Sequence, residues 1–127
     1  MPAANNDLLR IDAITHEDGV ISATISINPN SEILKGHFPG QPIVPGACML
    51  QIIKEILEGA LNTSIRLKKA DHLKFLSMIN PENTRSVLLE VSYKFAGENT
   101  INVTGKLVNG EVVCFKLQGS FVTVPLN

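Results

Sequence analysis

Apolar and polar residues alternate with a period of two near the start of the chain. Within residues 19–28, four apolar residues share one parity, and polar residues occupy the other. The apolar four are Ile21, Ala23, Ile25 and Ile27. Such alternation is typical of a strand with one buried and one exposed face. Pro29 and Asn30 end this strand, and a shorter strand is predicted before it over residues 8–14.

The period changes to that of a helix over residues 47–61, directly after Gly46. Apolar residues cover most of the circumference, so the helix is predicted to be mostly buried. Four polar residues share one face at spacings of i, i+3, i+4 and i+7: Gln51, Lys54, Glu55 and Glu58. This polar stripe is most simply a solvated face, or an outlet toward a second chain.

Strand periodicity returns after the helix. Residues 64–78 and 87–95 are predicted strands, separated by turn-forming residues at 80–83. Two more strands, over 100–108 and 111–124, flank Asn109-Gly110. This dipeptide favours a two-residue type I′ hairpin, because both of its positions need positive φ.

The predicted order is therefore two strands, a long loop, one apolar helix and about four antiparallel strands. A single helix with so much apolar surface requires a sheet that curls around it. We therefore expect an α+β architecture of the hot dog type, with an antiparallel sheet wrapped around one long central helix. Open strand edges in such a sheet commonly pair with a second copy, so a homodimer or a higher oligomer of such dimers is expected.

Composition narrows the possible classes of function. The chain has 127 residues, 44% hydrophobic content and a formal net charge of -1, which predicts a single domain over residues 1–127. The 11 basic and 12 acidic residues are interleaved, so no nucleic-acid partner is expected. No apolar run approaches the roughly 18 residues of a membrane span, and no secretion signal is apparent, so we expect no membrane association and a cytoplasmic location. The two cysteines, Cys48 and Cys114, are expected to stay reduced.

The segment before the helix combines three prolines, three glycines and a histidine, and it runs from Lys35 to Gly46. Its prolines and glycines fix an irregular backbone without many side-chain contacts. Pro45 and Gly46 lead into the first helical turn, whose N–H groups suit a carbonyl oxygen or an oxyanion. Because Gly46 lacks a side chain, a ligand could come close to it.

This segment resembles the 3-hydroxyacyl-acyl-carrier-protein dehydratases of fatty acid synthesis. Their signature is a His-Phe-Pro-Gly, further prolines, and a Pro-Gly that opens the central helix. The matching residues here are His37-Phe38-Pro39-Gly40, Pro42 and Pro45-Gly46. The likeness extends more weakly over most of the chain, from about Ser31 onward. It implies a substrate carried on acyl carrier protein or as a CoA thioester, and no cofactor.

The resemblance also implies roles for individual residues. His37 would remove a proton from C2 of a 3-hydroxyacyl thioester, since a neutral imidazole is a suitable base near pH 7. The first helical amides, those of Gly46 and Ala47, would polarise the thioester carbonyl. The nearby residues expected to contact substrate are Phe38, Pro39 and Pro45.

This chain differs from the family at the residue that should protonate the leaving hydroxyl. There, a helix carboxylate from the partner subunit, fourteen residues after the histidine, supplies the proton. The equivalent residue here is Gln51, whose amide can donate a hydrogen bond but cannot hand over a proton as a carboxylic acid does. Glu55, one turn further along the same face, is the nearest substitute.

Other functions remain open, because fold analogy alone does not choose a chemistry. The chain could be a non-catalytic acyl-carrier or acyl-thioester binding subunit of a heterodimer. It could also be an acyl thioesterase in which His37 or Glu55 activates water. His16 and His72 are expected to be structural, and three scattered histidines without paired-ligand spacing predict no metal site.

Overall fold

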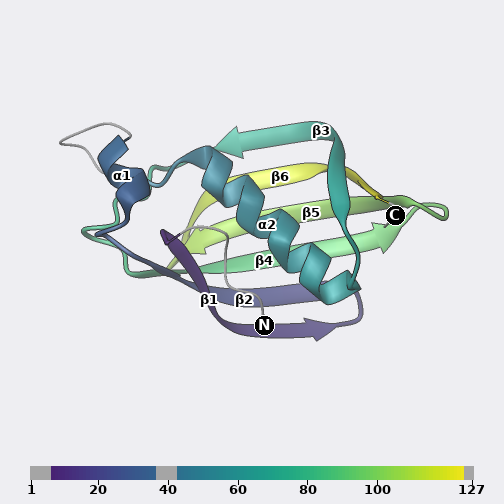
Figure 1. Ribbon diagram of the computed structural model, residues 1–127, viewed down its shortest axis with the longest axis horizontal. Coiled ribbons are helices and arrows are strands. Elements are labelled where there is room, and N and C mark those ends of the chain that lie inside the picture. Colours follow the sequence, from purple (N-terminus) through teal and green to yellow (C-terminus); the bar gives the residue numbers. More distant parts are fainter. Residues whose placement is uncertain (1–6, 37–42, 125–127) are drawn as a thin grey trace.

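The computed structural model describes residues 7–36 and 43–124, which form two helices and a six-stranded antiparallel sheet (Figure 1). The strands are β1 (Leu9–Glu17), β2 (Val20–Ile27), β3 (Ile65–Phe75), β4 (Ser86–Phe95), β5 (Thr100–Asn109) and β6 (Val112–Thr123). The helices are α1 (Glu32–Gly36) and α2 (Gly46–Leu61). Within this described part of the chain, neither helix is long and apolar enough to cross a membrane.

The strands lie in the order β1-β2-β4-β5-β6-β3, and α2 crosses one face of the sheet they form (Figure 1). β3 follows α2 in the chain but pairs with β6, so the helix connects the two halves of the sheet. This antiparallel sheet around one apolar helix is the hot dog fold, and the architecture predicted from the hydrophobic periods is confirmed.

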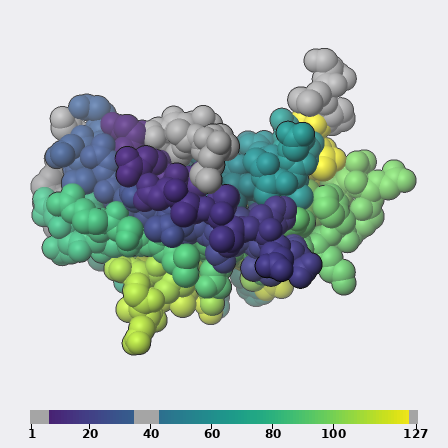
Figure 2. Space-filling model, turned by 90° about the horizontal axis from the view of Figure 1, so that it is seen from below, coloured from purple at the N-terminus to yellow at the C-terminus, as the bar shows by residue number. Residues whose placement is uncertain are grey.

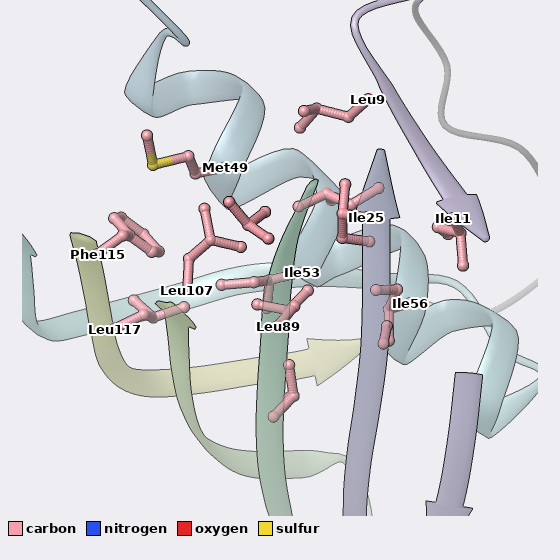
Figure 3. Close-up of a cluster of buried hydrophobic side chains, with 14 of the residues drawn as sticks. Leu9, Ile11, Ile25, Met49, Ile53, Ile56, Leu89, Leu107, Phe115 and Leu117 are labelled. Carbon is pink, nitrogen blue, oxygen red and sulfur yellow. The ribbon is translucent and has the colours of Figure 1, made fainter. Parts of the chain in front are cut away.

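The core lies between α2 and the inner face of the sheet. The parity predicted for the second strand is correct, because Ile21, Ala23, Ile25 and Ile27 are all buried. Figure 3 shows side chains of α2, among them Met49, Ile53 and Ile56, next to residues of several strands. Gly105 on β5 makes this packing close: a Cβ there would lie 3.1 Å from Cδ1 of Ile53.

The loop predicted between β2 and α2 contains one short helix. Ser31, which is buried, caps α1 by accepting a hydrogen bond from the backbone N–H of Ile33 (3.2 Å). The Ser31 hydroxyl in turn donates to the carboxylate of Asp7. This contact between residues far apart in the sequence explains why the local pattern alone did not predict α1.

The turn of the β5–β6 hairpin differs from its prediction. The β5–β6 hairpin is present, but its last paired residues are Asn109 and Val112, so the loop residues are Gly110 and Glu111. Asn109 does not adopt positive φ, whereas Gly110 does (φ 63°), so the predicted type I′ turn at Asn109-Gly110 is wrong. Positive φ at both loop positions occurs instead between β1 and β2, at Asp18 (51°) and Gly19 (78°).

β3 forms one edge of the sheet and ends at Phe75, three residues earlier than predicted. Every residue of β3 after Ile65 is exposed, including Leu73 (41%) and Phe75 (57%). At the opposite edge lies β1, whose purple residues face the viewer in Figure 2. An exposed edge strand with large apolar side chains is suited to pairing with another chain.

Candidate active site

Three residues of the predicted site lie outside the described residues: His37, Phe38 and Pro39. The structure describes the site from Ile43 onward, where the chain enters α2. The position of the proposed base relative to the helix therefore stays a prediction.

The N-terminus of α2 begins with an extended Pro45 (φ -64°, ψ 141°) followed by Gly46. No side chain caps this first turn, and the turn contains no acidic residue. The backbone N–H of Cys48 donates to the carbonyl oxygen of Pro45 (3.0 Å), whereas the amides of Gly46 and Ala47 come before this first bond. Ala47 is exposed. The partial positive charge of the helix end is therefore not offset by an acidic side chain within the turn.

A hollow of about 510 Å³ opens beside this helix end. The residues that line it are Ile43, Val44, Pro45, Gly46, Met49, Phe75, Leu76, Ser77 and Met78. All but Ser77 are apolar or glycine, so the hollow suits a hydrocarbon chain. Pro45 and Gly46, which were predicted to contact substrate, therefore line an apolar hollow. The sequence analysis did not predict that residues 75–78 would form part of its wall.

Gly46 is in contact with the aromatic ring of Phe75. A Cβ built on Gly46 would overlap that ring, so the absence of a side chain is what lets Phe75 lie against the helix end. The ring also contacts Phe115, with centroids 5.2 Å apart. In this structure Phe75, rather than a ligand, uses the space that Gly46 leaves open. Phe75 is itself 57% exposed, so its ring lies between the buried Phe115 and the solvent-facing side of the hollow.

Gln51 and Glu55 are joined by a hydrogen bond on α2. The amide Nε2 of Gln51 donates to Oε1 of Glu55 at 3.2 Å, as their spacing of one helical turn permits. Gln51 is half-buried, and Glu55 is only 7% exposed, which corrects the expectation that this stripe is simply solvated. A buried carboxyl at this position is an unusual feature for a helix face.

The part of α2 that carries Glu55 borders a second hollow, of about 330 Å³. It is lined by Ile11, Ile14, His16, Glu55, Ile56, Gly59 and Ala60. Among the described residues, therefore, Pro45 and Gly46 share one hollow and Glu55 lines another. Gln51 lines neither of the two, but its amide connects to the second through Glu55.

Cys48 and the two other histidines lie in surroundings that fit structural residues. Burial raises the pKa of the Cys48 thiol, which agrees with a small packed residue rather than a nucleophile. His16 lies 2.6 Å from the hydroxyl of Tyr93 through its Nε2, and their rings also contact each other. His72 is exposed on β3. Across the part of the chain that the structure describes, no group of three potential ligands could hold a metal ion.

Comparison with known families gives a match over most of the chain. Residues 13–111 match the ApeI-like family, described as ApeI dehydratase. A 3-hydroxyacyl-acyl-carrier-protein dehydratase, FabZ, from Fusobacterium nucleatum is 24% identical over 118 residues, which cover 89% of this chain and 82% of that protein.

Solved structures share the fold at lower identity. The dehydratase heterocomplex ApeI:P from Xenorhabdus doucetiae superposes with a TM-score of 0.67 at 15% identity, covering 87% of this chain and 96% of that one. A thioesterase from Pseudomonas aeruginosa gives a TM-score of 0.66 at 13% identity, covering 93% of this chain and 82% of that one. Proteins with this fold thus include both dehydratases and thioesterases.

Proposed function

The chain belongs to the ApeI-like dehydratase family, and from this membership we propose that it dehydrates 3-hydroxyacyl thioesters carried on acyl carrier protein, with His37 as the base. The observation that carries the proposal is the apolar hollow of about 510 Å³ at the uncapped start of α2. It offers space for an acyl chain directly beside amides that can bind a thioester oxygen. His37 precedes this helix end by nine residues.

The proposed reaction needs a base and an oxyanion site. His37 takes the proton from C2, and the electrons of that C–H bond pass into the enolate of the thioester. The amides of Gly46 and Ala47 stabilise the developing negative charge on the carbonyl oxygen, because fixed dipoles need no reorganisation. The C3–O bond then breaks, and the hydroxyl leaves as water after it gains one proton.

The source of that last proton is the distinctive part of the proposal. Gln51 occupies the position where the family resemblance implies a carboxylate, and its amide orients a hydroxyl without protonating it. Glu55 is hydrogen-bonded to Gln51 and buried, and it lines a hollow other than the one at Gly46, so we assign the Glu55 carboxyl of one subunit as the substitute acid for substrate bound at Gly46 of the other. A positioned acid contributes roughly 10²–10⁴ in rate, so a chain with an indirect acid is a weak dehydratase.

A partner subunit belongs to this proposal. The exposed edge strand β3 carries Leu73 and Phe75, and Phe75 also lines the hollow at Gly46. Pairing along β3 with a second copy would bury these apolar side chains and bring another chain beside the hollow. We therefore propose a homodimer.

A second candidate is supported by Gln51 together with the ApeI:P heterocomplex, which has the same fold. In this alternative, the chain is an acyl-carrier or acyl-thioester binding subunit, and a different partner contributes the acid. It predicts binding of an acyl carrier without turnover by the isolated chain. A thioesterase would instead release free thiol from an acyl-CoA, which a thiol reagent detects.

The deciding experiment follows formation of the enoyl thioester, or its hydration in reverse, by ultraviolet absorbance. His37→Ala should abolish the reaction, while the matched variant His72→Gln, which changes an exposed histidine that lines neither the hollow at Gly46 nor the hollow at Glu55, should keep it. Equal rates for wild type and His37→Ala would exclude the mechanism. Carrier binding with no turnover by the wild type would favour the heterodimer subunit.

A further inference from the structure

Three lysines stand in one row on the sheet face turned away from α2. Strand register pairs Lys106 of β5 with Lys116 of β6, and Lys116 with Lys74 of β3. Directly paired residues on adjacent strands project from the same face, and neighbouring strands lie about 4.8 Å apart. The three lysines are 32 and 10 residues apart in the sequence, so only the strand order brings them together.

The row is only partly neutralised. Lys106 lies 3.6 Å from Glu90, the next residue in the same row on β4, and both side chains are about half exposed. Lys74 and Lys116 make no ion pair with any residue that the structure describes. Like charges placed directly opposite each other destabilise a sheet. In a chain of net charge -1, such a row is an uneven concentration of positive charge.

The three lysines line a hollow of about 570 Å³ together with Glu90, whose carboxylate pairs with Lys106 and leaves Lys74 and Lys116 as the uncompensated charges. Beside the lysine row runs a second row of polar side chains, paired by the same register: Ser92, Thr104, Gln118 and His72. Figure 2 shows the β5–β6 hairpin, in yellow-green, projecting from this side of the sheet. The face thus combines a strip of positive charge with a strip of hydrogen-bonding groups, at a size typical of small-molecule sites.

We propose that this face binds a small phosphorylated molecule that carries at least two phosphate groups, such as the diphosphate of a nucleotide. Lysine is a point-charge ligand of phosphate, and three lysines at strand spacing can contact adjacent phosphates together. The polar row would receive the uncharged hydroxyl-bearing part of the molecule. A hollow of this size can enclose a small ligand, whereas an acidic polypeptide would mainly contact the open surface around it. The proposal is independent of the dehydration proposed above.

Two sources could supply this chemistry: a free nucleotide, or the nucleotide end of coenzyme A. The test measures binding of ADP, coenzyme A, pyrophosphate and adenosine to the full chain by isothermal titration calorimetry, at low and high salt. Lys116→Gln, the centre of the row, is the test variant. Lys68→Gln removes the same charge from an exposed position of β3 outside the hollow and is the matched control.

We expect ADP and pyrophosphate to bind, adenosine not to bind, and the affinity to fall with salt. Lys116→Gln should weaken ADP binding at least tenfold, and Lys68→Gln should leave it within twofold. If coenzyme A displaces ADP, the site is assigned to the nucleotide end of the coenzyme. If ADP binds and coenzyme A does not displace it, the site is assigned to a free nucleotide. Equal losses in the two variants, or binding of a polyglutamate peptide with none of ADP, would overturn the proposal.

Discussion

Replacing Gln51 by glutamate tests whether this face of α2 supplies the acid. In the wild type, Nε2 of Gln51 donates to Oε1 of Glu55 at 3.2 Å. In Gln51→Glu that donor becomes a carboxylate oxygen, so two carboxyl groups meet on a half-buried helix face. Two such groups cannot both be ionised at close range without a large cost, and the pair therefore retains one proton.

The size of this effect follows from the distance. With an effective dielectric constant of about 20, two unit charges at 3.2 Å repel by about 5 kcal/mol. If the side chains relax to roughly 6 Å, about 3 kcal/mol remains. Because this repulsion opposes the second ionisation, it raises the pKa of the introduced carboxyl above its ordinary value. The introduced carboxyl would then keep its proton at a higher pH than an isolated carboxyl does.

We expect Gln51→Glu to raise the dehydration rate at least tenfold, within the roughly 10²–10⁴ that a positioned acid contributes, and the gain should grow as pH falls from 8 to 6. The pH–rate profile of enoyl-thioester formation measures this. The double variant with Glu55→Gln removes the second charge, so its profile should shift to lower pH. A rate no higher than that of wild type at any pH would refute the assignment of an acid function to this helix face.

Three further outcomes test the structure itself. Gly105→Ala should lower the free energy of unfolding by about 1–3 kcal/mol, because its Cβ would lie 3.1 Å from Cδ1 of Ile53, and adding Ile53→Val should relieve this loss in urea denaturation. Strictly additive losses would contradict that contact. Hydrogen bonds from Ser26 and then Arg10 hold the pKa of Asp12 below its ordinary 3.8, so its stabilisation should be present above pH 3.8 and vanish as pH falls through the lower folded value. Urea unfolding of Asp12→Asn should therefore differ from wild type at pH 6 and converge with it at strongly acidic pH, and a difference that does not depend on pH would oppose the assignment. Burial raises the pKa of the Cys48 thiol, so iodoacetamide at pH 8 should alkylate it more slowly than a cysteine in an unfolded peptide. Mass spectrometry measures the extent of labelling, and faster labelling would indicate an activated thiol.

Local spacing was a good guide to the elements and a poorer guide to their turns. The hairpin at Asn109 was predicted correctly, yet its loop lies one residue later. β6 has an extra residue near Cys114: Leu107 pairs with Phe115, but Val108 pairs with Val113. Such a bulge shifts the end of the ladder and so selects the loop residues. Asp18-Gly19 is also a dipeptide that favours a type I′ turn, and both of its residues do adopt positive φ between β1 and β2.

The candidate site was predictable only in part. Gly46 was chosen for ligand access, but the contact that requires it comes from Phe75, which is 29 residues further along the chain. The burial of Glu55 also went unpredicted, because its neighbours in the sequence indicate a solvated stripe. His37 lies outside the described residues, so its role still rests on the sequence motif and the family.

By itself, the sequence determined the strand parity, the apolar helix, the proline-glycine entry to that helix and the amide in place of a carboxylate. Each of these depends on residues that are near one another in the chain. The tertiary structure alone decided that β3 becomes an exposed edge, that residues 75–78 complete the hollow at Gly46, and that three distant lysines align. These features arise from which strands pair and in what register, and register is set by the burial of the whole inner face rather than by any local segment.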